Sequence, residues 1–256
     1  MFNWDATLYN RFLTERTQPA IDLARRIPLT AAHRVIDIGC GPGNSTKVIA
    51  DRFPEAQVTG ADCSEEMIRQ AGEQYPELNF VLFDAVTDFE KLSEKYDVVF
   101  SNACIQWIPD QRKLIRDMAG TLKPGGVLAV QLPYNYDEPI HRIIRNVADR
   151  EPWRGKLKGA RQKYTLEIPE YAGLLSDVTD SYELWVTTYY HRMPTHESIL
   201  EWYRGTGLRP YLAHLDAAEA DAYEQEVLAE IRKAYPEQAN GEILFRFPRL
   251  FFMAEK

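Results

Sequence analysis

The stretch that decides the fold is residues 35–43, VIDIGCGPG. Its first four residues are apolar except for Asp37, and such a run is typical of a parallel strand buried on both faces. Glycine then occupies every second position, and glycine lets a backbone turn tightly and approach a bound ligand. Residues 44–50 can open a helix whose first N–H groups face the turn. Strand, turn and helix start together predict a ligand pocket.

The spacing of the glycines favours one class of cofactor. Dinucleotide-binding turns carry G-x-G-x-x-G, whereas this stretch carries G-x-G-x-G. Pro42 removes one N–H that could bind a phosphate, and Asp37 would repel a diphosphate but suits a ligand with an ammonium group. The pattern therefore favours S-adenosylmethionine over a nicotinamide dinucleotide. A tight turn without a ligand is the alternative at this point.

Composition narrows the class of protein. The chain has 256 residues, 45% of them hydrophobic, and a formal net charge of −8. The length fits one large domain with a cap, and the charge argues against a nucleic-acid partner. No apolar run reaches the ~18 residues of a membrane span, and residues 1–5 do not resemble a signal peptide. The three cysteines have no metal-ligand spacing, so we expect a cytoplasmic protein without a metal.

Strands and helices alternate in the first half of the chain. Strands are expected at 34–38, 57–61, 79–83, 96–101 and 127–131, the last after a turn at 124–126, with helices at 45–52, 65–74 and 111–122. Such alternation predicts an α/β fold, a mostly parallel sheet with helices on both faces.

The second half has a different pattern. Helices are expected at 138–149, 198–203 and 217–234, a loop at 151–163, and strands at 182–190 and 243–254. Because proline cannot donate to a ladder, the last strand should be interrupted at Pro248, which belongs at an edge or bulge. The helices between these late strands predict a cap over the cofactor cleft.

Acidic and small residues follow the predicted strands where an open α/β sheet binds its ligands. Asp62 could accept hydrogen bonds from a ribose diol, and Asp84, beside Ala85, could accept one from an adenine amino group. Asn102 and Trp107 follow the fourth strand. Each signal is weak singly, since a loop acid or helix cap would look the same, but their joint order is specific.

In these motifs the chain resembles the class I S-adenosylmethionine-dependent methyltransferases, with VIDIGCGPG, Asp62, FDA at 83–85, SNA at 101–103 and LKPGG at 122–126. The resemblance implies a seven-stranded Rossmann-like sheet with an antiparallel last strand. It also implies that Gly39 lies beside the methionine moiety, Asp62 at the ribose, Asp84 near the adenine and Asn102 near the methyl-bearing end. The predicted cofactor-binding residues are Asp37, Gly39, Cys40, Gly41, Asp62, Cys63, Met67, Asp84, Ala85, Asn102 and Trp107.

A closer resemblance extends over nearly the whole chain. Its segments QWIPD at 106–110, TTYYH at 187–191, TGLRP at 206–210 and FPRLF at 247–251 are similar to the trans-aconitate 2-methyltransferase family. This resemblance implies monomethyl ester formation on a small polycarboxylate. We expect one methyltransferase domain with a core of about 30–135 plus strands at 181–192 and 243–254, and a cap of about 136–176 and 195–240, in a monomer or small homo-oligomer.

The implied chemistry needs no catalytic base. A carboxylate is already ionised near pH 7 and a sulfonium methyl is already activated, so alignment and exclusion of water suffice. The remaining carboxylates call for arginines and neutral donors. We expect substrate binding by Trp4, Tyr9, Arg16, Tyr134, His141, Tyr189, Tyr190, Arg204 and Arg246, with Arg11, Arg209 and His191 as further candidates. Since neighbouring strand residues face opposite ways, either Tyr189 and His191 or Tyr190 should face the cleft.

Other functions stay open on the sequence alone. The acceptor could be another small acid, or a phenol or carbon nucleophile that would need a base such as His141 or His191. A nicotinamide-dependent oxidoreductase is disfavoured by the glycine spacing. A protein that binds the cofactor without turnover is the remaining alternative.

Overall fold

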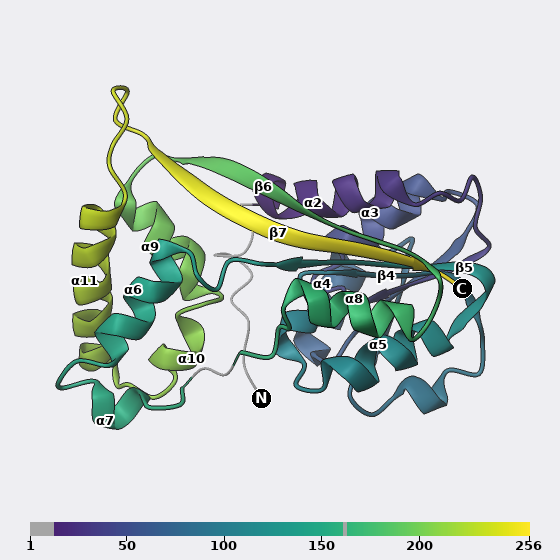
Figure 1. Ribbon diagram of the computed structural model, residues 1–256, viewed down its shortest axis with the longest axis horizontal. Coiled ribbons are helices and arrows are strands. Elements are labelled where there is room, and N and C mark those ends of the chain that lie inside the picture. The colour runs from purple at the N-terminus through teal and green to yellow at the C-terminus, as the bar shows by residue number, and fades with distance from the viewer. Residues whose placement is uncertain (1–12, 161–162) are drawn as a thin grey trace.

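A seven-stranded sheet runs through the length of the molecule in the computed structural model, which describes residues 13–160 and 163–256 (Figure 1). The strand order is β3-β2-β1-β4-β5-β7-β6. The strands are β1 (Arg34–Ile38), β2 (Gln57–Asp62), β3 (Asn79–Leu82), β4 (Tyr96–Asn102), β5 (Leu122–Pro133), β6 (Ser181–Met193) and β7 (Ile243–Glu255).

Strands β1 to β6 run in the same direction, and β7 lies antiparallel between β5 and β6. Ile36 at the centre of β1 pairs with Thr59 of β2 and Val99 of β4, and β7 runs antiparallel to both β5 and β6. The central strands are continuous apolar runs because helices cover both of their faces. This topology confirms the predicted fold class, including the antiparallel last strand.

Helices cover the two faces of the sheet, and the side chains of β4 alternate between them. Val98 and Phe100 pack with Leu23 of α2 in one core, whereas Val99 packs with Tyr171 of α8 in the other. The helices of this part of the chain are α2 (Leu13–Arg26), α3 (Asn44–Arg52), α4 (Glu65–Gln74), α5 (Gln111–Gly120) and α8 (Ile168–Ser176), with the short turns η1 (Phe89–Lys91) and η2 (Ile105–Trp107). The cap range predicted as 136–176 thus includes α8, a helix that packs on the sheet.

Five helices gather at one end of the sheet and form a further core (Figure 1). This core, called the helical cap below, joins Ile144, Tyr223 and Val227 to Phe245 of β7. Its helices are α6 (Pro139–Ala148), α7 (Arg154–Leu157), α9 (His196–Arg204), α10 (Arg209–Leu212) and α11 (Ala217–Ala234). The first half of β7 therefore belongs to the cap core, and its second half to the sheet.

Two local predictions need correction, and one helix was not predicted. Residues 151–163 are not simply a loop, because α7 forms there with Trp153 buried against Tyr223 and its Nε1 donating to Glu226 at 3.0 Å. The turn predicted at 124–126 is part of β5, where the N–H of Gly125 donates to the carbonyl of Lys256 at 2.6 Å. Helix α2 was not predicted, although Ala20, Leu23 and Ala24 in it are spaced to bury one face.

Pro248 does not interrupt β7. The strand is continuous and interior to the sheet, so the predicted break is wrong. In an antiparallel strand the N–H and C=O of one residue point to the same side, and the carbonyl of Pro248 accepts from Tyr134, just beyond the end of β5. Pro248 has no N–H to donate, but the side on which it would donate lies beyond the end of β5. At this one position β7 has no β5 residue beside it and resembles an edge strand.

Asp37 ties β1 to α3 beneath the glycine turn. The residue is fully buried, and its Oδ2 accepts hydrogen bonds from Ser45 Oγ at 2.7 Å and Thr46 Oγ1 at 2.8 Å. Burial raises the pKa of Asp37 from its ordinary 3.8 to about 6, although both hydroxyl bonds act to lower it. The Asp37 carboxylate thus fixes the start of α3, but its burial lowers the stability of the folded protein more when the group is ionised.

We predict that Asp37→Asn stabilises the protein more at pH 8 than at pH 4. The folded form holds the Asp37 proton more tightly than the unfolded chain does. The folding stability that this proton contributes is therefore present below pH 4 and is lost as the pH rises through about 6. The amide oxygen of asparagine can still accept both hydroxyl bonds. Urea unfolding between pH 4 and 8 should show the stability difference between variant and wild type growing by up to about 3 kcal/mol. The exposed Asp221→Asn is the control, and a difference that is flat with pH would contradict the prediction.

Candidate functional site

A cleft of about 1050 Å³ opens between the carboxyl ends of the parallel strands and the helical cap. Its lining begins at the glycine turn after β1 and continues through Asp62 and Asn102 to Pro133 at the end of β5. The opposite wall includes Tyr203 of the cap. Residues far apart in the chain meet here because an open α/β sheet gathers its strand ends at one edge.

The glycine turn brings bare backbone to the cleft. Gly39, Gly41 and Gly43 all have positive φ, at +76°, +54° and +91°. A Cβ on Gly39 would lie 2.1 Å from the Cys104 Sγ, so only glycine fits there. The N–H groups of Gly39 and Cys40 both donate to the carbonyl of Ala61, which fixes the turn against β2. A Cβ on Gly41, by contrast, would meet nothing within 4 Å, so the room for a ligand lies beside Gly41.

Asp62 at the end of β2 is held from two sides. Its Oδ2 accepts from the N–H of Gly41 at 3.0 Å, and its Oδ1 accepts from the N–H of Ser64 at 2.9 Å. Burial raises the pKa of Asp62, against the lowering effect of these backbone bonds. Each carboxylate oxygen can accept a further hydrogen bond, so both remain competent toward a diol in the cleft.

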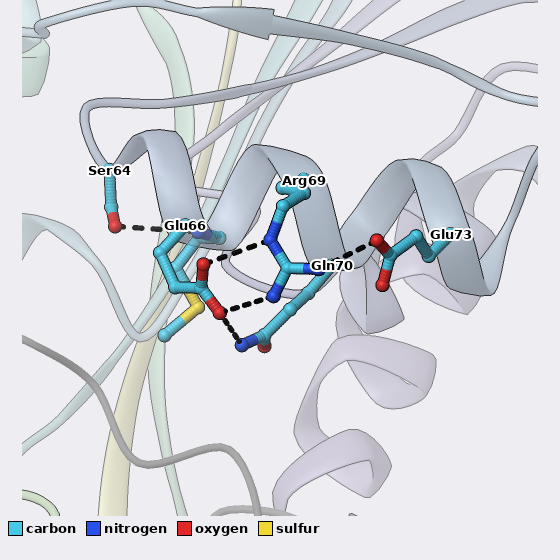
Figure 2. Close-up of polar contacts among 6 residues, drawn as sticks. Ser64, Glu66, Arg69, Gln70 and Glu73 are labelled. Atoms are coloured by element: carbon cyan, nitrogen blue, oxygen red, sulfur yellow. Dashed lines mark hydrogen bonds and ion pairs between the residues drawn. The ribbon is translucent and has the colours of Figure 1, made fainter.

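Helix α4 delivers Met67 to the cleft. Ser64 begins the helix as its N-cap, with Oγ accepting from the Met67 N–H at 3.4 Å. On its solvent face, Arg69 donates to Glu66 at 2.7 and 3.0 Å and to Glu73 at 2.6 Å, and Gln70 donates to Glu66 (Figure 2). These contacts span one turn of the helix and favour its formation, while Met67 is buried on the other side.

The segment after β4 is strained and polar. Ala103 has φ +55°, which is uncommon for a residue with a Cβ, and its N–H donates to the carbonyl of Gln131. Gln106 Nε2 donates to the Ala103 carbonyl at 2.6 Å, which holds this conformation. The Oδ1 of Asn102 is buried with no hydrogen-bond partner among the described residues. A buried acceptor without a partner is uncommon, so this oxygen is available to accept a hydrogen bond from a ligand at the edge of the cleft.

Ten of the eleven predicted cofactor residues line the cleft, namely Gly39, Cys40, Gly41, Asp62, Cys63, Met67, Asp84, Ala85, Asn102 and Trp107. Asp37 does not line it, because its side chain lies beneath the turn and binds Ser45 and Thr46. Both bonds use Oδ2, and the buried Oδ1 has no hydrogen-bond partner among the described residues, so a contact of Asp37 with a ligand ammonium group stays a prediction.

The predicted substrate residues divide into three groups: those that line the cleft, those that lie outside the described residues and those that do not line the cleft. Arg16, Tyr134, His141 and Arg246 line the cleft, as does the further candidate Arg209. Trp4, Tyr9 and Arg11 lie outside the described residues.

Three predicted substrate residues do not line the cleft. Arg204 donates from Nε and Nη2 to Glu224, at 2.8 and 2.6 Å, so its fork joins two cap helices. The hydroxyl of Tyr189 donates to Asp22 Oδ2 at 2.6 Å, and Tyr190 is 56% exposed. The sequence predicted that either Tyr189 and His191 or Tyr190 would face the cleft, but none of the three lines it. The ring of His191 instead stacks on that of Trp202, with the ring centroids 5.0 Å apart.

The cleft also contains charged residues that were not predicted. Arg246 forms an ion pair with Glu138, and Tyr134 donates to Glu167 at 2.7 Å, so two carboxylates lie among the basic and phenolic groups. Arg249 of β7 lines the cleft although it is only 3% exposed. Its signal in the sequence is a charge within the otherwise apolar run 247–251.

The part of the chain that the structure describes contains neither a metal-binding cluster nor a membrane-spanning helix. No group of three or more histidine, cysteine, aspartate or glutamate side chains in residues 13–160 and 163–256 is placed to hold a metal ion. In the same part of the chain, no helix combines the length and apolar character needed to cross a bilayer.

Comparison with solved structures supports the fold. A putative methyltransferase from Bacillus halodurans superposes with a TM-score of 0.60 at 14% identity, covering 93% of this chain and 99% of its own. The Haemonchus contortus phosphoethanolamine N-methyltransferase 2, solved in complex with S-adenosyl-L-methionine, gives a TM-score of 0.53 at 21% identity over 93% of this chain and 52% of its own. At these identities the likeness concerns the fold alone.

Comparison by sequence identifies the family. Residues 35–126 match the profile described as a methyltransferase domain. The trans-aconitate 2-methyltransferase of Rhodopseudomonas palustris strain BisB18 is 46% identical over 258 aligned residues, covering all of both chains. That of Variovorax paradoxus strain S110 is 42% identical, covering all of this chain and 99% of its own. The chain therefore belongs to the trans-aconitate 2-methyltransferase family.

Proposed function

We propose that the protein transfers a methyl group from S-adenosylmethionine to one carboxylate of trans-aconitate, forming a monomethyl ester. The observation that carries this proposal is the single cleft, which joins the glycine turn and Asp62 to a wall bearing Arg16, Arg246 and Arg249. Acidic acceptors at the sheet edge suit a ribose and an ammonium group, and guanidinium groups suit a polycarboxylate.

The ten cleft-lining cofactor residues are proposed to hold S-adenosylmethionine. Asp62 would accept from the ribose diol, and Asp84 would lie near the adenine. Gly39 and Gly41 would lie beside the methionine moiety, and the open space at Gly41 would allow its close approach. The buried Oδ1 of Asn102 is an acceptor near the methyl-bearing end. When bound, the cofactor supplies an activated methyl on a sulfonium sulfur.

The chain's own residues need only bind, align and exclude water. A carboxylate attacks without losing a proton, so no side chain has to act as a base. Alignment of two bound reactants in a closed cleft can contribute several kcal/mol through proximity. Arg16, Tyr134, His141 and Arg246 are the proposed substrate contacts, and Arg246 would exchange its pairing with Glu138 for a substrate carboxylate.

The remaining assignments follow from charge and composition. We infer a cytoplasmic protein acting as a monomer or small homo-oligomer, with a small molecule rather than nucleic acid as partner. The net charge of −8 and three free cysteines support this inference. The cap helices are proposed to act with the sheet as one methyltransferase domain.

We predict that the purified protein transfers labelled methyl from S-adenosylmethionine to trans-aconitate and that the product releases its label in mild base. His141→Ala should retain ester formation, because the carboxylate needs no base. Loss of turnover with unchanged KM in that variant, together with a base-stable product from a phenol or carbon acceptor, would favour the alternative acceptor class. Absence of a base-labile ester at saturating cofactor would contradict the proposal.

We predict that Asp62→Ala weakens cofactor binding far more than substrate binding. Charge-assisted hydrogen bonds to two ribose hydroxyls stabilise by about 1.5–3 kcal/mol each, so the Kd for S-adenosylhomocysteine should rise at least about tenfold. Calorimetry measures this Kd, and the KM for trans-aconitate is measured at saturating cofactor. The exposed Asp177→Ala is the matched control. Equal losses for cofactor and substrate would show that the role assigned to Asp62 is wrong.

A further inference from the structure

Arg249 carries a positive charge into the interior where the sheet meets the cap. It lies opposite Pro133, the last residue of β5, and its side chain is 3% exposed while lining the cleft. Its Nη1 donates to Gln131 Oε1 at 3.4 Å. Gln131 in turn pairs across the sheet with Asn102 of β4. The guanidinium group is therefore one strand away from the position proposed for the methyl-bearing end.

A second guanidinium group, that of Arg16 in α2, contacts the aromatic pair that Arg249 also contacts. Arg16 lies over the ring of Trp202 at 5.2 Å and donates from Nη2 to the Trp202 carbonyl at 3.4 Å. Trp202 contacts Phe247 at 5.6 Å, and the guanidinium of Arg249 lies 4.5 Å from the Phe247 ring centroid. Arg16 and Arg249 thus flank one pair of aromatic rings, which shields both charges from water.

The side chains packed around Arg249 add no competing positive charge. Gln131 is a neutral amide, and His191 is held neutral because burial, followed by the charge of Arg249, lowers its pKa to about 4. Arg246 pairs with Glu138 and Arg204 with Glu224, whereas Arg249 and Arg16 lie against the rings of Phe247 and Trp202. These contacts join Arg249 and Arg16 to one aromatic pair at the wall of the cleft.

We propose that Arg249 and Arg16 form the subsite for a substrate carboxylate that is not methylated. The proposal rests on the proposed function and specifies its substrate class as an acid with at least two carboxylates. A guanidinium fork matches a carboxylate in shape and charge, and low exposure strengthens the pairing. Methyl transfer removes the negative charge of the reacting carboxylate, so an ion pair with that group would weaken in the transition state and oppose the reaction. The carboxylate held by the guanidinium groups is therefore the non-reacting one.

The test compares Arg249→Gln with wild type on trans-aconitate and on an unsaturated dicarboxylate that lacks one of its carboxylates. We expect the variant to raise the KM for trans-aconitate at least tenfold and to reduce the preference for the tricarboxylate over the dicarboxylate. The Kd for S-adenosylhomocysteine should stay within twofold. Arg16→Gln should act in the same direction, and Arg192→Gln is the control, since that exposed side chain pairs with Glu242 outside the cleft.

Calorimetric binding of trans-aconitate to the S-adenosylhomocysteine complex separates the possible failures. If wild type forms the ester and Arg249→Gln binds trans-aconitate as tightly as wild type does, the subsite is wrong and the proposed function stands. If wild type neither binds nor methylates trans-aconitate, both are wrong. Should Arg249→Gln fail to fold, Arg249→Lys and Arg16→Gln decide, because lysine keeps the charge but loses the fork. Unchanged KM values in both variants would overturn the subsite.

Discussion

The structure depends on the pairing of β7 between β5 and β6. This one strand contributes to every core, because Phe245 packs with the cap, Leu250 with α5 and α8, and Phe251 with α2. Its ladder with β6 extends from Ser181 to Met193 without a break. Side chains that alternate along a strand face opposite sides of a sheet, so β7 fixes the cap relative to both helical layers. The cleft lies between the sheet and the helical cap, and β7 holds the two together because it packs in the cores of both.

The charged groups of the cleft differ along its length. Acidic Asp62 and Asp84 lie at the strand ends, whereas arginines, together with Glu138 and Glu167, lie on the side of the cap and β7. This arrangement offers carboxylates to a cationic ligand at the strand ends and guanidinium groups to an anionic ligand beside it. Burial of Asp37 and Asp62 raises the pKa of each and shows what the fold tolerates to keep acids near the glycine turn.

Much of the sheet could be predicted from the sequence because its signals are local. The range of β1 and the helix at 65–74 agree with the structure, since apolar runs and the Ser64 cap depend on neighbouring residues. Helix α7 could not be predicted, because Trp153 is buried only through Tyr223 and Glu226 of a distant helix.

The same distinction explains the candidate site. The cofactor side follows strand ends and could be located by position, whereas the substrate side depends on contacts between distant segments. Arg204 appeared well placed in the cap, but Glu224, twenty residues further along, captures its guanidinium. Arg249 was not predicted, because nothing in its neighbouring residues explains a charge inside an apolar strand. Its place at the cleft depends on the end of β5, which lies opposite it.

The end of β5 near Pro248 has a mechanical consequence. Beyond that point, β6 and β7 continue toward the cap as a two-stranded ribbon, since β7 pairs with β5 only from Arg249 onward. Two-stranded ribbons twist more readily than broader sheets. Any rotation of the cap against the sheet must therefore wind or unwind this ribbon. The width of the cleft then follows a torsion of β6 and β7, and the ribbon acts as a spring rather than as a hinge.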